Sequence, residues 1–298
     1  MIAAGLVLLL GGGAWLVSGA VALARRWGLS PMVIGVTLVG MGTSLPELLT
    51  SLRAAMQGAP DLALGNVVGS NIANVLLILG LAALIRPVPV PRADLRRDGA
   101  ATLAVTLAAS AWIVVAGGVG HLGGAAFLLL FALWMAWQLR TGAAADEEEG
   151  PVPAPLRAAG TIAAGLVGLV AGTELLVRGA IGVAEGFGVS EAVIGLTVVA
   201  IGTSLPELAT SAVAAWKGRA EVALGNVLGS NVFNLLAILG ATGAAVPLAA
   251  DARFAALDLW VMVGALVAAL ALSLSGRIGR RGGAALLAGY GLYMATLL

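Results

Sequence analysis

Long apolar stretches alternate with short polar breaks along almost the whole chain. About ten of these stretches approach 20 residues or more, the length that a helix needs to cross roughly 30 Å of hydrocarbon. They lie near residues 2–24, 31–56, 62–85, 99–117, 122–139, 158–184, 191–216, 222–246, 255–274 and 282–298. The breaks between them contain arginine, glycine and proline, which is typical of loops. The pattern therefore predicts an all-α polytopic membrane protein with ten transmembrane helices.

The composition excludes several classes of protein. A chain with 60% hydrophobic and 10% charged residues does not suit a water-soluble globule, and the lipid bilayer is the partner it requires. A net charge of +1 without a basic block excludes nucleic acid as a partner. The chain has no cysteine and only one histidine, His121, which argues against an enzyme with an activated nucleophile. No cofactor is indicated, and the sequence identifies no protein partner.

One long polar stretch interrupts the hydrophobic pattern. Residues 141–157 contain an acidic run, 146–149, followed by several prolines. Such a segment cannot bury enough apolar surface to offset the cost of ordering it, so a solvated linker is expected. It separates residues 1–140 from residues 158–298.

The basic residues are concentrated in alternate loops. If the N-terminus lies outside, 13 of the 16 fall in inner loops, and only Arg53, Arg178 and Arg253 do not. Cytoplasmic loops of membrane proteins carry most of the lysine and arginine. We therefore predict a multi-pass protein of the cell membrane with both termini outside and the linker 141–157 in the cytoplasm.

An internal repeat relates the two halves. Shifted by 160 residues, positions 31–80 align with 191–240 without a gap, and 30 of the 50 residues are identical. Shared hydrophobicity cannot explain this, because GTSLPE at 42–47 recurs at 202–207. Each half holds about five spans, and an odd number makes the halves cross the membrane in opposite directions. The sequence thus predicts two inverted five-helix repeats, 1–140 and 158–298, with discontinuous helices at the midplane.

Polar residues cluster inside the repeated spans. Pro46 and Pro206 cannot donate a backbone hydrogen bond, so the helices are expected to open around 40–43 and 200–203. Helical spacing places hydroxyls on the same face as Glu47 and Glu207, and serine on the same face as asparagine in the next span. The candidate groups are Thr43, Ser44, Glu47, Ser70, Asn74, Thr203, Ser204, Glu207, Ser230 and Asn234.

Each candidate also has a purely structural interpretation. The two glutamates could reach the membrane surface, and the prolines could only kink their helices. The hydroxyls could bond to their own helices, and the serines and asparagines could link neighbouring helices. Asp61 and Glu221 begin equivalent spans, where the helix dipole favours an acid; an ion funnel is the alternative.

The candidate ligands all offer oxygen, which favours hard cations as substrates. Two glutamates carry a charge of −2, which one Ca²⁺ neutralises, whereas Mg²⁺ demands a tighter octahedral cage. Na⁺ also fits such a site. Two ionised carboxylates without a bound ion have a high electrostatic free energy in a medium of low dielectric constant. The change between the two access states should therefore require one divalent ion or several monovalent ions. These electrostatics predict exchange.

The doubled motif GTSLPE, followed by GNxxGSNxxN, resembles the α-repeats of the calcium/cation antiporter superfamily, in particular the microbial sodium/calcium exchangers. The resemblance covers about 50 residues in each half and implies exchange of several Na⁺ for one Ca²⁺ by alternating access. It also implies that Glu47 and Glu207, with Thr43 and Thr203, hold Ca²⁺. The Na⁺ ligands that it implies are Ser44, Ser70, Asn74, Ser204 and Ser230 and the carbonyls of Gly40 and Ala200.

One position departs from the pattern of some members. Where several have aspartate at the end of the second motif, this chain has Asn234, so both halves end in a neutral amide. This argues against potassium dependence and removes one proton site. Antiport of Ca²⁺ against H⁺ through the same two glutamates is the alternative, because two protonated carboxylates are as neutral as one bound Ca²⁺. A passive channel would not need strongly binding carboxylates at the midplane.

Overall fold

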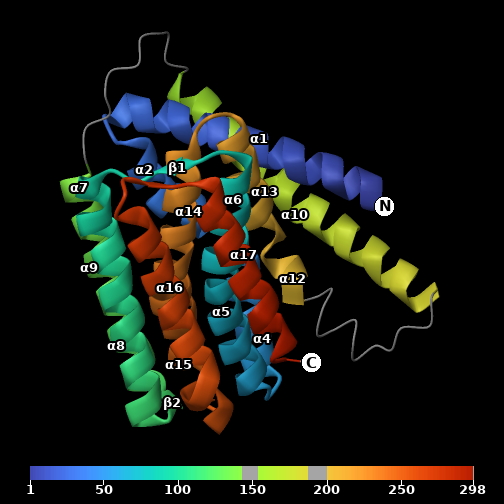
Figure 1. Cartoon of the computed structure of the whole chain (residues 1–298). Helices are drawn as coiled ribbons and strands as arrows, with labels where there is room; N and C mark the ends of the chain where they lie inside the picture. The colour runs from blue at the N-terminus through green and yellow to red at the C-terminus, as the bar shows by residue number, and fades with distance from the viewer. Residues whose placement is uncertain (143–153, 187–199, 298) are drawn as a thin grey trace.

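The computed structural model describes residues 1–142, 154–186 and 200–297. In Figure 1, two long helices, α1 and α10, lie obliquely across one side of a bundle of upright helices. The first half contains α1 (Ile2–Trp27), α2 (Pro31–Ile34), η1 (Gly35–Val39), α3 (Gly40–Thr43), α4 (Leu45–Met56), α5 (Pro60–Ala73), η2 (Asn74–Ile78), α6 (Leu79–Ile85), β1 (Val88–Pro89), α7 (Arg92–Asp94), η3 (Leu95–Gly99), α8 (Ala100–Ala116), β2 (Gly118–Val119) and α9 (His121–Thr141). The η segments are π-helical turns within longer helices.

The described part of the second half follows the same order, without an element that corresponds to α7. It contains α10 (Pro155–Gly186), α12 (Ala200–Thr203), α13 (Leu205–Trp216), α14 (Ala220–Val232), η5 (Phe233–Ile238), α15 (Leu239–Ala245), β3 (Leu248–Ala249), η6 (Phe254–Asp258), α16 (Leu259–Ser273), β4 (Arg277–Ile278) and α17 (Arg280–Ala295).

Seven helices within the described residues are long and apolar enough to cross a membrane, and an eighth is formed if one bent pair is counted as a span. The seven are Ile2–Trp27, Pro60–Ile85, Arg92–Ala116, His121–Thr141, Pro155–Val183, Ala220–Ala245 and Phe254–Ser273. The predicted last span, near 282–298, corresponds to α17, which has 16 residues and is not one of the seven. The predicted span 191–216 lies partly outside the described residues. The prediction of a helical, multi-pass membrane protein is confirmed.

The bent pair lies at the first GTSLPE motif. Met32–Thr43 and Leu45–Met56 meet at Ser44 with a bend of 43°. The prediction placed the opening at 40–43, but these residues are helical as α3, and the irregular backbone lies at Ser44, with φ −86° and ψ 8°. The reason is that Pro46, at the start of α4, lacks the N–H that would continue the helix. In the second half, Ser204 has nearly the same geometry, with φ −89° and ψ 6°.

Contacts between the halves are reciprocal. β1 pairs with β4 and β2 pairs with β3, both antiparallel. Residue 88 of β1 and residue 248 of β3 are 160 positions apart, and β2 and β4 correspond within one residue. Each of the two strands in one half therefore pairs with a strand from the other half.

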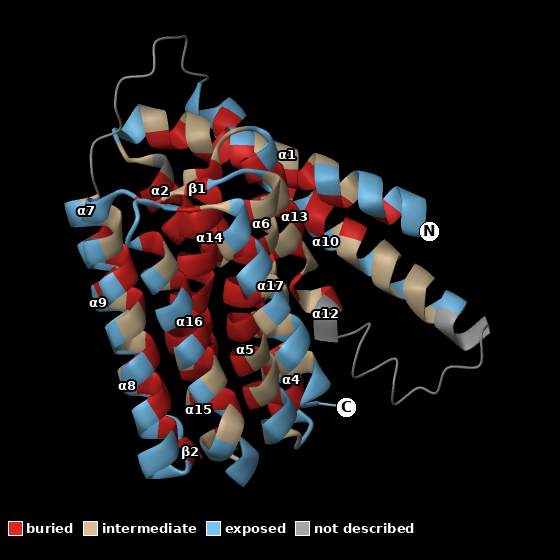
Figure 2. Cartoon of the chain, in the orientation of Figure 1, coloured by how far each residue is buried: buried red, intermediate tan, exposed pale blue. Residues whose placement is uncertain are grey.

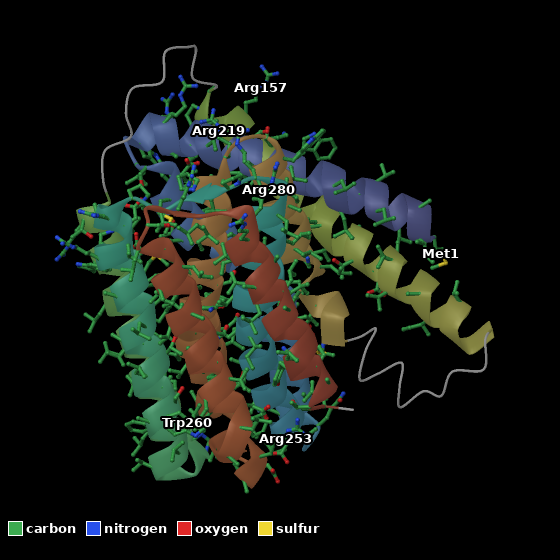
Figure 3. All side chains as sticks on the ribbon, in the orientation of Figure 1. Met1, Arg157, Arg219, Arg253, Trp260 and Arg280 are labelled. Atoms are coloured by element: carbon green, nitrogen blue, oxygen red, sulfur yellow. The ribbon has the colours of Figure 1, made fainter. Side chains whose placement is uncertain are left out.

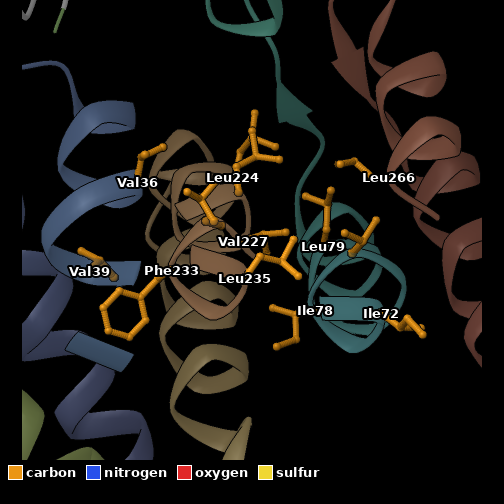
Figure 4. Close-up of a cluster of buried hydrophobic side chains, with 14 of the residues drawn as sticks. Val36, Val39, Ile72, Ile78, Leu79, Leu224, Val227, Phe233, Leu235 and Leu266 are labelled. Carbon is orange, nitrogen blue, oxygen red and sulfur yellow. The ribbon is translucent and has the colours of Figure 1, made fainter. Parts of the chain in front are cut away.

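The helices differ strongly in burial (Figure 2). The most apolar 18-residue stretch is fully buried within the helix Ala220–Ala245 and 72% buried within Pro60–Ile85. The corresponding share is 28% in both Arg92–Ala116 and His121–Thr141. Figure 4 shows side chains of η1, α14 and α6 packed together, among them Val36, Leu224 and Leu79. The two central helices thus carry the core, and helices apolar all round surround them.

Glycines allow α1 and α10 to pack backbone against backbone. A Cβ added at Gly12 would lie 2.7 Å from the Leu169 nitrogen, and one at Gly165 would lie 2.6 Å from the Leu16 nitrogen. Small residues at such seams let membrane helices approach closely. The pair therefore forms a smooth contact with no side chains interlocked at these positions.

Candidate ion-binding site

Two acidic side chains from different halves are buried in the centre of the bundle. Glu47 lies in the first turn of α4 and Glu207 in the first turn of α13, and each is 1% exposed. Ser44 Oγ donates a hydrogen bond to Glu207 Oε1 at 2.7 Å, and Ser204 Oγ donates to Glu47 Oε1 at 3.2 Å. The serine preceding each helix thus holds the carboxylate of the other half.

Four buried oxygens in this region have no hydrogen-bond partner within the described chain. They are Glu47 Oε2, Glu207 Oε2, Asn74 Oδ1 and Asn234 Oδ1. No lysine or arginine of the described residues forms an ion pair with either glutamate. Burying acceptors and charges without partners costs several kcal/mol. Two carboxylate oxygens and two amide oxygens are therefore available to a hard cation.

The two amides lie at π-helical turns of the central helices. Asn74 begins η2 and Asn234 lies within η5, and each side chain is 1% exposed. Such turns interrupt the regular helix and often occur at functional sites. The sequence places Ser70 and Asn74 on one face of a regular helix. In the structure, Ser70 lies in α5 and Asn74 begins the π-helical turn that follows it.

The hydroxyls of the two threonines are engaged by asparagines of the other half. Thr43 Oγ1 lies 3.1 Å from Asn226 Oδ1 and 3.1 Å from the Val39 carbonyl oxygen. Thr203 Oγ1 lies 3.3 Å from Asn66 Oδ1. The structural interpretation of these hydroxyls is thus observed for Thr43, which contacts its own helix as well as a neighbour.

The remaining serines, Ser70 and Ser230, belong to the central helices α5 and α14. Ser204 Oγ is 3.3 Å from Ser70 Oγ, and Ser230 Oγ donates to the Gly40 carbonyl oxygen at 3.3 Å. A Cβ added at Gly40 would lie 2.9 Å from the Ser230 nitrogen, so a larger residue would push the two helices apart. Ala200 begins α12 next to the undescribed segment, and its predicted role stays a prediction.

The sequence suggests that Asn66 and Asn226 only hold the backbone in place, and it does not identify their serine partners, Ser51 and Ser211. Asn66 Nδ2 donates to Ser51 Oγ at 2.9 Å and to the Glu47 carbonyl oxygen at 3.3 Å. Asn226 makes the equivalent bonds to Ser211 and Glu207, at 2.9 and 3.4 Å. Ser51 and Ser211 are 160 residues apart, and this repetition is the sequence feature that could have identified them.

Asp61 and Glu221, a further pair of acids at the repeat distance, lie away from this cluster. Asp61 is exposed in the first turn of α5, and Glu221 lies in the first turn of α14. Both positions fit the predicted interaction of an acid with a helix N-terminus.

The fold and the buried oxygens define a multi-pass membrane protein whose interior suits hard cations. A family model described as sodium/calcium exchanger protein matches residues 1–140 and 157–298. A putative antiporter, CaxA of Alkalimonas amylolytica, is 41% identical, with 93% of this chain and 89% of that protein covered. The sodium/calcium exchanger MaX1 of Methanosarcina acetivorans is 34% identical, with 82% of each chain covered.

A solved structure has the same fold. The sodium-calcium exchanger NCX_Mj, from a crystal soaked with Na⁺ and Sr²⁺, superposes with a TM-score of 0.90 and 34% identity, covering 100% of this chain and 97% of that one. The chain belongs to the sodium/calcium exchanger family. It is a secondary transporter of the cation/Ca²⁺ antiport type, not an enzyme, and Na⁺ and Ca²⁺ are cargo, with no cofactor involved.

Proposed function

We propose that this protein exchanges Na⁺ for Ca²⁺ across the cell membrane by alternating access, with Ca²⁺ held between Glu47 and Glu207. The observation that carries the proposal is that each buried carboxylate keeps one oxygen without a partner and has no cation of the described chain beside it. A charge of −2 in a low-dielectric interior needs a counter-charge before the protein can change conformation. One Ca²⁺ or several Na⁺ supply it.

The ligand roles follow from which oxygens remain available. Ca²⁺ would take the two carboxylates together with oxygens of Thr43 and Thr203; since both hydroxyls contact asparagines, their backbone carbonyls are the better candidates. Na⁺ would take the flanking groups, which are Ser44, Ser70, Asn74, Ser204, Ser230, Asn234 and the carbonyls of Gly40 and Ala200. When Na⁺ is absent, the unpartnered amide oxygens of Asn74 and Asn234 would also be ligands for Ca²⁺. The cross-bonds from Ser44 and Ser204 support a shared site, because each links the serine of one half to the acid of the other.

Ten helices in two inverted repeats would provide the two access routes. The reciprocal strand pairs and reciprocal serine–glutamate bonds support a two-fold relation between the halves. The buried site residues require a movement before ions can enter, and the smooth glycine contact of α1 with α10 would permit sliding. In Figure 3, Arg157, Arg219 and Arg280 lie at one end of the bundle and Arg253 at the other, which supports a cytoplasmic position for the first end.

Efflux of Ca²⁺ from vesicles tests the proposed coupling. Purified protein is reconstituted in liposomes loaded with Ca²⁺, and efflux is followed while external Na⁺, K⁺ and pH are varied separately. We expect Na⁺ to drive efflux at constant pH and K⁺ to have no effect. Efflux driven by acid alone would replace Na⁺ with H⁺ as the coupling ion, and efflux without any counter-ion would indicate a channel.

A further inference from the structure

We propose that Asn71 and Asn231 are positioning residues that turn the side-chain oxygens of Asn234 and Asn74 toward the bound ion. This inference rests on the proposed function, since it concerns two of the proposed ligands. It assigns a role to a second pair of asparagines in the repeated motif, one that does not itself offer an unpartnered oxygen.

The geometry consists of two crossed amide pairs. Asn74 Nδ2 donates to Asn231 Oδ1 at 3.0 Å, and Asn234 Nδ2 donates to Asn71 Oδ1 at 3.0 Å. All four side chains are at most 2% exposed. In each pair, the acceptor belongs to one half of the chain and the donor to the other.

An amide has two chemically different ends, and the crossed bonds determine which end faces the site. With Nδ2 of Asn74 and Asn234 tied to an acceptor, Oδ1 is the end that points away, and both Oδ1 atoms are without a partner. Rotation by about 180° around the last side-chain bond would exchange the ends and present NH₂ donors to a cation. The acceptors at Asn71 and Asn231 oppose this rotation.

Asn71 is itself held in the orientation that this role needs. Its Nδ2 lies 3.4 Å from the backbone carbonyl oxygen of Asn231 and 3.6 Å from Met262 Sδ. Since the nitrogen faces these acceptors, Oδ1 faces Asn234. The backbone at Asn231 thus fixes the orientation of the Asn71 amide. Asn71 in turn orients the proposed ligand Asn234, which belongs to the same helix as Asn231.

A buried asparagine that only links helices is the competing interpretation, and the two differ in how substitutions combine. Asn71→Leu keeps a side chain that branches at Cγ but is bulkier, and it removes the acceptor. If Asn71 acts through Asn234, its loss should weaken Ca²⁺ binding in the wild-type background but have no further effect when the Asn234 amide is already gone. A structural role would lower stability in both backgrounds and leave affinity unchanged.

The test is a double-substitution cycle measured by calorimetric titration of Ca²⁺ into purified protein in detergent, at fixed pH and without Na⁺. We expect Asn71→Leu to weaken Ca²⁺ binding about tenfold, the effect of a lost hydrogen bond that orients an ion ligand. Asn71→Leu/Asn234→Ala should bind no more weakly than Asn234→Ala. Gln138→Leu, which removes a fully buried amide that donates to Asp98, serves as the control and should bind Ca²⁺ normally.

The repeat supplies a second, independent cycle with Asn231→Leu and Asn74→Ala, for use if a variant of the first cycle fails to fold. Wild-type affinity in Asn71→Leu, or losses that add fully in the double variant, would overturn the inference while leaving the exchange function intact. A wild-type protein that binds no Ca²⁺ would instead overturn the proposed function. The two failures are therefore distinguishable.

Discussion

Two pairs of buried acids, each separated by the repeat distance of 160 residues, are treated in opposite ways by the fold. Asp98 and Asp258 are 1% and 4% exposed, nearly as buried as Glu47 and Glu207. Asp98 forms an ion pair with Arg97 at 2.8 Å and accepts a hydrogen bond from Gln138 at 2.8 Å. Asp258 lies 3.3 Å from Arg253 and accepts a bond from the Tyr293 hydroxyl at 3.1 Å.

The two glutamates have fewer hydrogen-bond partners and no counter-charge within the described chain. Each accepts one serine hydroxyl on one oxygen and keeps the other oxygen free of any partner in the described chain. A buried carboxylate with a permanent counter-charge contributes to the fold, whereas one without a counter-charge needs a cation that comes and goes. The presence or absence of a counter-charge separates the two aspartates from the two proposed transport acids more sharply than burial does.

The largest expected effect comes from removing one transport charge. Glu47→Gln or Glu207→Gln preserves the size and the acceptor for serine but leaves a charge of −1 for a divalent ion. We expect Na⁺-driven Ca²⁺ efflux to fall at least about 100-fold, because attraction between opposite charges is strong at low dielectric. Vesicle flux measures this, and near-normal exchange in either variant would remove that glutamate from the site.

Adding a third acid should change the pH response. Asn234→Asp adds a third titratable carboxyl to the proposed ligands without changing the size of the side chain. At low pH the new group is protonated and neutral, so exchange should approach the wild-type rate; as pH rises it ionises and should strengthen Ca²⁺ binding several-fold. Titrations of Ca²⁺ at several pH values test this against the wild type. A parallel pH dependence in both proteins would place residue 234 outside the ion site.

Neutralising a structural acid should affect stability and not transport affinity. Asp98→Asn leaves the Arg97 guanidinium, which is partly exposed at 17%, without its carboxylate partner. We expect a loss of about 2 kcal/mol, or a melting temperature lower by about 4 °C, because the arginine can reach water. Thermal unfolding in detergent and Ca²⁺ titration are the two measurements. A large loss of Ca²⁺ affinity at unchanged stability would show that Asp98 acts in ion binding, so the aspartate pair would no longer differ in role from the glutamate pair.

The strongest local signals in the sequence predicted the helical membrane fold and the residues that the structure brings together. Pro46 and Glu47 were evident because the repeat duplicates a rare polar motif, yet the break lies at Ser44, since proline chemistry limits the position only to within a turn. The helix Arg92–Ala116 begins well before the predicted 99–117, because hydropathy marks the edge of the hydrocarbon and not the end of the helix.

The hydrogen-bond partners of the site residues could not be predicted from the sequence in the same way. Helical spacing places Ser44 near Glu47, but the Ser44 hydroxyl bonds Glu207, since the packing of the two halves decides which carboxylate is nearer. The amide pairs of Asn71 with Asn234 and Asn74 with Asn231 depend on the same packing. Asp98 and Asp258 could have been found, because they are identical residues at the repeat distance.

The smallest effect is expected at an acid that shares its helix position with Glu47 but not its burial. Asp61 lies in the first turn of α5, as Glu47 does in α4, and it is exposed to solvent. Asp61→Asn should therefore leave the rate of Na⁺-driven Ca²⁺ exchange within about twofold of the wild type, because water and the helix N-terminus already stabilise the charge. The same flux assay at low and high ionic strength tests this. A several-fold loss of rate at low salt that disappears at high salt would show that Asp61 attracts cations toward the site, and burial alone would then not separate transport acids from the rest.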